Sequence, residues 1–362
     1  MKKVKKIFVL LLALISGLVI YPSVNQAGEF NFAVNPVIPE NQVDKSVSYF
    51  DLLLGENQKQ ELQVALRNDT EQAVVVDVDL ANATTNTNGV VEYSPNKIPI
   101  DPSLKHQLSD IAEAPKSITV PANGQTELKI NLTMPDESFS GVIAGGITLS
   151  QHKEAEKEES QAAGVSIKNE FSYVIGLVVR ENEQTVEPNL LLNDVRPDQL
   201  NARNVIVSSL QNDQPTYINQ VAIDGIVTKQ GNSKALYKVN QSGMQIAPNS
   251  SFAFPLPLNG EKLEAGRYHM KLTVYGNKNE KGKYEQKVGE KFDHRWVLEK
   301  DFVVSEKTAD KLNKQDVTIK EENNWWIYLL IGIILLLLVL IVLLLIFLRK
   351  KKEEDNEKEK NS

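Results

Sequence analysis

A loop of small amides and hydroxyls is the richest source of candidate binding groups in this chain. Residues 83–89 read Ala-Thr-Thr-Asn-Thr-Asn-Gly, and Val-Val-Glu-Tyr follows directly. The amides of Asn86 and Asn88 can donate and accept hydrogen bonds, and the ring of Tyr93 can stack on a sugar. This combination suits a glycan ligand. The alternative is that Asn-Thr-Asn-Gly simply forms a turn, for which Asn and Gly are the usual residues.

A second set of candidate binding residues lies in the segment 30–42. Its sequence, Phe-Asn-Phe-Ala-Val-Asn-Pro-Val-Ile-Pro-Glu-Asn-Gln, alternates apolar and polar residues and is ended by two prolines. Alternation with a period of two predicts a strand with one solvated face. Polar side chains on that face are available to a ligand or a partner, and the candidates are Asn31, Asn35, Glu40 and Asn41.

Groups that could support catalysis or bind a metal ion are sparse. Asp77 and Asp79 form an Asp-x-Asp pair that could hold calcium or act as paired carboxylates, but alternation along a solvated strand explains them better. The chain has no cysteine, which excludes thiolate zinc sites, iron–sulfur clusters and thiol nucleophiles. The histidines are scattered, with no two at ligand spacing on one element: His106, His152, His269 and His294. We therefore expect no catalytic residue, no metal and no cofactor.

A glycine pair, Gly145-Gly146, lies in the apolar run 141–147. It resembles a phosphate-binding glycine loop, but no helix follows that could offer its N-terminus to a phosphate. We predict instead a strand that another backbone or a ligand approaches closely.

The overall composition excludes further classes. A net charge of −7 argues against a nucleic-acid-binding protein, which needs a basic surface to displace counterions from phosphate. Aromatic residues make up 7% of the chain, too few for a base-stacking platform. The hydrophobic fraction of 41% is that of an ordinary globular protein.

Residues 28–186 predict a first β-sandwich. Short alternating or apolar runs recur with turn residues between them, as in residues 61–67, 73–80, 117–120, 126–134, 141–149 and 171–180. Residues 151–163, rich in Glu and Lys, look like an exposed hairpin tip. Residues 102–114 could hold one short helical turn.

Residues 187–304 predict a second, immunoglobulin-like sandwich, with about seven strands in just over a hundred residues. The strands begin at Leu190 and the last ends at Val304. The following stretch, residues 305–324, is polar, mixes Lys with Asp and Glu, and shows no apolar period. We interpret it as a stalk.

Both ends of the chain carry membrane-targeting patterns. Residues 1–27 combine four lysines, an apolar run and a small residue before Gly28, which is typical of a cleaved secretory signal. Residues 325–348 contain no charge and are long enough to cross a bilayer as a helix. The basic run 349–352 follows, so the positive-inside rule predicts that the tail, 349–362, is cytoplasmic. An acidic exported part without cysteines fits a Gram-positive envelope.

Several segments in a fixed order resemble the WxL-interacting protein family of low-GC Gram-positive bacteria. The match covers nearly the whole chain and rests on residues 30–42, 49–52, 86–93, 141–147, 201–206, 244–250 and 258–263. The resemblance implies that the first sandwich is a peptidoglycan-binding domain and the second a host-binding domain. It also implies partnership with secreted proteins that carry a WxL wall-binding domain.

Together, the patterns and the resemblance predict a non-enzymatic, membrane-tethered surface adaptor that binds WxL-domain proteins and peptidoglycan. The candidate contacts with peptidoglycan or the partner are the seven residues of the loop and the opening strand. The alternatives are an adhesin whose second domain binds host extracellular-matrix protein directly, and a carbohydrate-active enzyme using Asp77 or Asp79.

Overall fold

The computed structural model describes residues 31–153, 171–319 and 325–360. The predicted signal peptide and most of the predicted hairpin tip at 151–163 therefore lie outside the described residues. Of two compact units, the larger contains the first sandwich and most of the second. The smaller contains the ends of β12, β13, β16, β17 and β19 together with α3 and α4.

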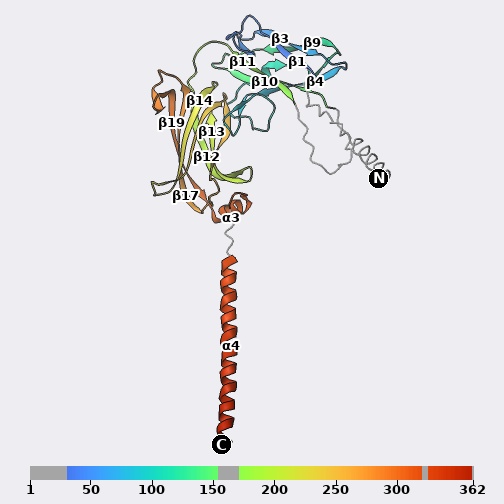
Figure 1. Cartoon of the computed structure of the whole chain (residues 1–362). Helices are drawn as coiled ribbons and strands as arrows, with labels where there is room; N and C mark the ends of the chain where they lie inside the picture. The colour runs from blue at the N-terminus through green and yellow to red at the C-terminus, as the bar shows by residue number, and fades with distance from the viewer. Residues whose placement is uncertain (1–30, 154–170, 320–324, 361–362) are drawn as a thin grey trace, which may run out of the picture. The chain divides into compact units, whose positions relative to one another are not determined.

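The first sandwich is made of two sheets (Figure 1). One has the order β1-β3-β9-β7: Ala33–Val37, Lys59–Asn68, Gly124–Thr133 and Ala112–Glu113. The other has the order β2-β11-β10-β4-β8: Phe50–Leu53, Ser172–Arg180, Ile143–Gln151, Val74–Asn82 and Ser117–Val120. The strands pair antiparallel except β2 and β11, which run parallel.

Alternation along the strands builds the core between the two sheets. In β3, Leu62, Val64 and Leu66 are buried, while the residues between them are more exposed. They pack into one cluster with buried residues of the facing sheet, including Ile147 and Leu177. One solvated face per sheet is the usual arrangement of antiparallel sandwiches.

The glycine pair lies in the central strand β10, as predicted. A Cβ on Gly145 would stand 2.2 Å from the carbonyl oxygen of Ala81, and one on Gly146 would stand 2.4 Å from that of Tyr93. The approach of neighbouring backbone therefore requires glycine at both positions. The prediction of a strand that another backbone approaches closely is confirmed. The approaching backbone, at Ala81 and Tyr93, belongs to the same chain.

Two small elements connect the strands of the first sandwich. β5 (Thr84–Thr85) and β6 (Val91–Glu92) form a two-stranded sheet; β5 lies within the predicted binding loop, and Asn86 and Asn88 lie in the turn between the two strands. The short helix α2 (Leu108–Ile111) lies within the segment where a helical turn was expected, and its Leu108 and Ile111 are buried.

The second sandwich also has two sheets. A three-stranded sheet has the order β12-β13-β16: Leu190–Leu200, Arg203–Asn212 and Ser250–Pro257. A five-stranded sheet has the order β15-β14-β17-β19-β18: Ala235–Ile246, Ile218–Lys229, Gly266–Lys278, Glu290–Val304 and Tyr284–Lys287. The predicted fold class, two immunoglobulin-like sandwiches and a C-terminal helix, is confirmed.

The first part of the predicted stalk is folded instead of extended. Helix α3 (Glu306–Gln315) begins where the side chain of Ser305 accepts a hydrogen bond from the backbone N–H of Thr308. Its Ala309 and Leu312 are buried, one helical turn apart. The stalk interpretation therefore does not describe residues 305–315, because two apolar residues at helical spacing are enough to bury one face of a short helix.

The end of α3 is fixed by buried polar contacts. The Asn313 side chain donates to the carbonyl of Leu263 at 2.8 Å and accepts from its N–H at 2.9 Å. The carboxylate of Asp316 accepts from the N–H of Asn204 at 2.7 Å. Burial raises the pKa of Asp316, but hydrogen bonds from Thr318, Asn204 and neighbouring backbone outweigh it and lower the pKa below its ordinary value.

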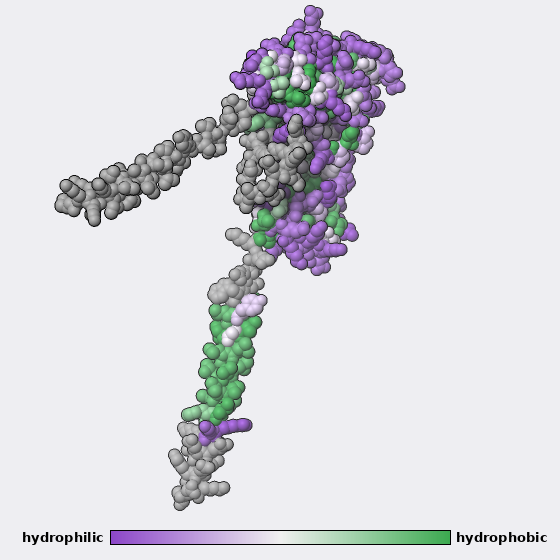
Figure 2. All heavy atoms as spheres, turned by 90° about the vertical axis from the view of Figure 1, so that its right-hand side faces the viewer, coloured by the Kyte–Doolittle hydropathy of each residue, from purple (hydrophilic) through white to green (hydrophobic). Residues whose placement is uncertain are grey.

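Helix α4 (Trp325–Lys360) is of a different kind. Its segment Ile327–Lys350 is long and apolar enough to cross a membrane, and none of it is buried within the protein. Figure 2 shows most of this segment as a hydrophobic surface, which gives way to a hydrophilic band at its basic end. A long helix that is apolar on all sides and unburied is typical of a membrane span.

Candidate functional site

The loop 83–89 forms a turn whose amide groups are largely engaged within the loop. The side-chain amide oxygen of Asn86 (Oδ1) accepts hydrogen bonds from the backbone N–H groups of Asn88 and Val90, at 2.9 and 3.1 Å. Its side-chain nitrogen donates to the carboxylate of Glu92 at 2.8 Å. Asn86 therefore holds the turn between β5 and β6, which is the alternative role that its sequence allowed. Only the side chain of Asn88 is exposed.

The same loop packs against the strands of the second sandwich. Gly89 has a φ of +70°, and a Cβ there would stand 2.6 Å from the side chain of Met244. Its carbonyl accepts from the N–H of Gln245 at 2.8 Å. Thr85 accepts from the N–H of Ala247 at 2.9 Å and from the hydroxyl of Ser250 at 3.0 Å.

A second group of hydrogen bonds is centred on the buried residues Asp101 and Asn249. The carboxylate of Asp101 accepts from the side chains of Ser251, Ser103 and Gln211. The amide of Asn249 donates to Ser103 at 3.1 Å. We call the buried residues of these two groups the polar joint, and they are Thr85, Asp101, Asn249 and Ser250, with exposed fractions of 1% to 8%.

The ionisation of Asp101 reflects this network. Burial raises its pKa, but the hydrogen bonds from Ser251, Ser103 and Gln211 together outweigh burial and lower the pKa below the ordinary value. The carboxylate is therefore charged in the folded protein and stabilised by its partners. A buried carboxylate with its acceptor sites occupied is a structural group, with little capacity left for a ligand.

Of the four residues predicted on the opening strand, two are hydrogen-bonded within the protein and two are exposed. Asn41 exchanges two hydrogen bonds with Gln60, at 2.9 and 3.0 Å, and also donates to the carbonyl of Leu53. Asn31 donates to Gln151 at 2.8 Å. Asn35 and Glu40 are exposed. Of the four, Asn35 and Glu40 are therefore the ones whose side chains are available to a ligand or a partner, as the alternating pattern predicted.

Tyr93 is the predicted residue that lines a pocket. The pocket has a volume of 580 Å³, and we call it the tyrosine pocket. Its lining consists of Ser48, Tyr49, Asp51, Tyr93, Val174, Ile175, Gly176, Val178, Arg180, Tyr217, Asn219 and Gln245. Ligand pockets of this size with a few convergent polar groups are common binding sites.

Three tyrosines at the ends of strands form the aromatic part of this pocket. Tyr93 follows β6, Tyr217 precedes β14, and their hydroxyls are hydrogen-bonded at 3.2 Å. Both rings pack on an apolar cluster that includes Ala144, Val178 and Ala247.

Tyr49 precedes β2 and is 39% exposed. Its side chain lies beside Gly176 of β11, where a Cβ would stand only 3.5 Å from it. The backbone of Tyr49 is fixed by a hydrogen bond, because the buried side chain of Gln42 donates to the Tyr49 carbonyl at 2.8 Å. Tyr49 therefore presents an accessible ring on a fixed backbone.

The phenols of the pocket are neutral donors and acceptors. Burial raises the pKa of Tyr217 well above its ordinary value and also raises that of Tyr93. Burial and the nearby Asp51 carboxylate raise the pKa of Tyr49. All three hydroxyls therefore keep their protons at neutral pH.

One ion pair forms the polar wall. Arg180 of β11 pairs with Asp51 of β2, and both side chains are mostly buried. These are the neighbouring parallel strands, in which Asp51 lies opposite Val178. The two charges neutralise each other, so the lining residues that the structure describes carry no net charge.

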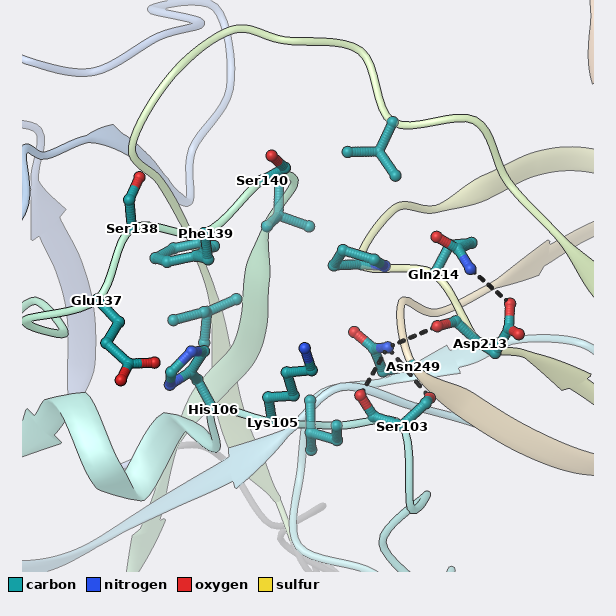
Figure 3. Close-up of a pocket in the computed structure, with 15 residues that line it drawn as sticks. Ser103, Lys105, His106, Glu137, Ser138, Phe139, Ser140, Asp213, Gln214 and Asn249 are labelled. Carbon is teal, nitrogen blue, oxygen red and sulfur yellow. Dashed lines mark hydrogen bonds between the residues drawn. The ribbon is translucent and has the colours of Figure 1, made fainter.

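A second pocket, of 490 Å³, has a different lining (Figure 3). We call it the His106 pocket. The ring of His106 contacts that of Phe139, with centroids 5.6 Å apart, and Lys105 and Glu137 lie on the same side of the view. On the other side, Asn249 and Gln214 are hydrogen-bonded to Asp213. The His106 pocket is therefore lined by charged side chains such as Lys105, Glu137 and Asp213, whereas the tyrosine pocket is lined by aromatic rings.

The residues considered for catalysis are placed as alternation predicts. Asp77 and Asp79 flank the buried Val78 of β4; Asp79 is exposed, and Asp77 contacts the ring of His152 at 2.8 Å. His269 contacts Asp301 at 2.7 Å. Within 31–153, 171–319 and 325–360, no three His, Asp or Glu residues are arranged to hold a metal ion.

Two sandwiches followed by an apolar helix define a β-sandwich protein with one candidate membrane span, and comparison with known families makes the class specific. The model of the WxL Interacting Protein peptidoglycan binding domain matches residues 32–151, and that of the host binding domain matches residues 162–314. The chain belongs to the WxL-interacting protein family. The resemblance inferred from its motifs is confirmed, and its two domains imply peptidoglycan binding and host binding at the cell surface.

Comparisons with individual proteins add little. No curated protein matches the sequence. The class 5 fimbriae chaperone CfaA is 14% identical over 75% of this chain and 99% of its own, with a TM-score of 0.31. The E. coli chaperone DraB is 14% identical over 67% of this chain and 92% of its own, with a TM-score of 0.25. Scores this low decide neither fold nor function.

The family matches divide the tyrosine pocket between them. Tyr49 and Tyr93 fall within the match to the peptidoglycan binding domain, whereas Tyr217 and Gln245 fall within the match to the host binding domain. Strand β11 also falls within the match to the host binding domain, although it pairs with β10 and β2 of the first sandwich. Sequence reasoning missed Tyr49, Tyr217 and Arg180 as site residues, since no local pattern joins them.

Proposed function

We propose that this protein is a membrane-anchored surface adaptor that holds WxL-domain proteins and peptidoglycan together at the Gram-positive envelope. The observation that carries the proposal is the pair of family matches on a chain with a C-terminal membrane-span candidate. A protein that binds the wall, binds another surface protein and stays in the membrane needs no catalytic group. It acts by fixing its partners in one place.

The anchor in this proposal is α4, with the sandwiches outside the cell and the tail in the cytoplasm. The apolar segment Ile327–Lys350 supports the anchor. The basic residues that follow the apolar run, beginning with Arg349, support the orientation, because positive charge is retained on the cytoplasmic side. Placing one tag directly after Gly28, behind the predicted cleavage site, and another at the C-terminus, and testing the accessibility of each tag to protease in intact protoplasts, checks this orientation.

Contact with a WxL protein is proposed to use the sandwich surfaces or strand addition at an open sheet edge. β1 supports the second mode, because it forms the edge of its sheet and pairs only with β3 in the described chain. Pro36 within β1 limits the length of strand that can be added, since proline has no N–H to donate.

The test is a pull-down with the detergent-solubilised full chain from a cell-surface extract of its own organism. Recovery of a protein that carries a WxL domain supports the adaptor function. Recovery of only wall fragments or matrix protein contradicts it and favours the adhesin described next.

The second candidate function is direct adhesion to host extracellular-matrix protein, favoured by the match of residues 162–314 to a host binding domain. A fragment that tests it should include α3, because Asn313 and Asp316 are bonded to Leu263 and Asn204. We expect a fragment of residues 187–319 to be better folded than one that ends with the predicted sandwich, residues 187–304. Matrix binding by the longer fragment supports adhesion, and its absence excludes the second domain as an independent adhesin.

The absence of enzymatic activity is also part of the proposal. It is supported by the two binding families and by the surface positions of Asp77 and Asp79. Replacing both with Asn should change nothing in a glycan-turnover assay, and turnover by the wild type that the replacement abolishes would identify an enzyme.

A further inference from the structure

We propose that the tyrosine pocket binds an uncharged sugar ring of a wall glycan, with the ring stacked on Tyr49. This rests on the proposed function, because it names the part of the wall polymer that the protein recognises and the residues that recognise it. It also places the site across the two matched domains, since residues of both line the pocket.

The shape of the pocket suits a flat, amphipathic ligand. Tyr49 supplies an exposed ring, and Gly176 beside it has no side chain to fill the space. A pyranose has an apolar face of C–H groups and a rim of hydroxyls. An aromatic ring can cover that face while polar groups around it bond the rim.

The polar groups of the pocket suit sugar hydroxyls and acetamido groups. Hydroxyls are provided by Tyr49, Tyr93 and Tyr217, and the amide of Gln245 donates to that of Asn219 at 2.6 Å. Each of these groups can both donate and accept, as a sugar hydroxyl can. Because the pKa values of all three tyrosines are raised, the pocket stays in this protonated form at any physiological pH.

The charge of the pocket disfavours the peptide part of the wall polymer. Among the described residues that line it, the one anion, Asp51, and the one cation, Arg180, are paired with each other. A charged peptide stem would have to break that pair or remain without a counter-charge, and both are unfavourable in a mostly buried site. The His106 pocket, with Lys105 and Glu137, offers such charges and serves as the matched comparison.

The experiment measures the binding of the detergent-solubilised full chain to three probes: purified sacculi, an N-acetylglucosamine tetramer and a synthetic stem peptide. Tyr49→Ala should weaken binding to sacculi and tetramer about tenfold, because the stacked ring is lost. Tyr49→Phe keeps the ring and should stay within about threefold. His106→Ala, in the other pocket, should bind as the wild type does.

The outcomes separate the pocket from the function. Sacculus binding that survives Tyr49→Ala overturns the pocket assignment and leaves peptidoglycan binding standing, whereas a wild type that ignores sacculi overturns the proposed function itself. Stem-peptide binding that depends on Tyr49 also overturns the sugar assignment. Tyr49-dependent binding supports it, and stripping secondary polymers from the sacculi with hydrofluoric acid identifies the source. Retained binding means the peptidoglycan strand, and lost binding means an attached wall polysaccharide.

Discussion

The polar joint and the tyrosine pocket both combine residues of the two matched domains, yet they use polar groups in opposite ways. In the joint, Thr85, Asp101 and Ser250 are almost fully buried, and each is bonded to other side chains of the chain. In the pocket, Tyr49 remains accessible, and Tyr93 is only half-buried. Buried and saturated polar groups stabilise a fold, whereas accessible ones beside an aromatic ring can bind a ligand. Substitutions in the two regions should therefore affect different properties.

The largest effect on stability is expected from Asp101→Ala. It leaves Ser251, Ser103 and Gln211 without their common acceptor, which should lower the free energy of unfolding by about 3 kcal/mol. Urea unfolding measures this. The matched control is Asp79→Ala, the same change on an exposed strand face, which should be nearly neutral. Equal effects for both variants would mean that the joint does not stabilise the fold.

A smaller loss should follow from acid. The folded pKa of Asp101 lies below its ordinary value of 3.8, so its contribution is fully present above that pH. It is lost as the pH falls through the folded pKa. The free energy of unfolding should thus fall below about pH 4, and Asp101→Asn should flatten that slope. A slope that Asp101→Asn leaves unchanged would show that other groups cause the acid loss.

In the pocket, Gly176→Val should act on binding alone. The added methyl groups occupy the space beside Tyr49 and should weaken sacculus binding about tenfold. A β-branched residue suits strand β11, so the free energy of unfolding should change by less than about 1 kcal/mol. Gly55→Val, in a loop outside the pocket, is the control. Unchanged binding by Gly176→Val would mean that the ligand does not enter this space.

The smallest effect concerns the loop first selected from the sequence. Asn86→Ala removes the acceptor for two backbone N–H groups and the donor to Glu92, and should lower stability by about 1 kcal/mol. Asn88→Ala should leave the stability unchanged, because the exposed side chain of Asn88 does not hold the turn. Thermal unfolding compares the two. Weakened sacculus binding by Asn88→Ala without loss of stability would support the loop as a ligand site.

Much of the fold was predictable from the sequence because its signals are local. Alternation at residues 61–67 predicted β3, and the uncharged run at 325–348 predicted the span within α4. Helix α3 was missed because its burial depends on only two apolar residues, Ala309 and Leu312, within a polar segment.

The candidate site was less predictable, since it depends on pairing between distant segments. Tyr93 was selected for its chemistry, but nothing near it in sequence indicates that Tyr217 bonds to it. Likewise, the pairing of Asp51 with Arg180 follows from the parallel register of β2 and β11, which no local pattern encodes. The Asn-rich loop is ambiguous from sequence because a turn and a sugar site favour the same residues, and the structure shows only that Asn86 bonds within the turn.

The most direct test of this division measures sacculus affinity and the free energy of unfolding together, for the full chain and for Tyr49→Ala and Asp101→Asn. We expect Tyr49→Ala to lose about tenfold in affinity while unfolding as the wild type does, and Asp101→Asn to lose stability while binding normally wherever it is folded. Normal binding by Tyr49→Ala, or an affinity that falls only in step with stability in both variants, would contradict the assignment of the tyrosine pocket as the ligand site.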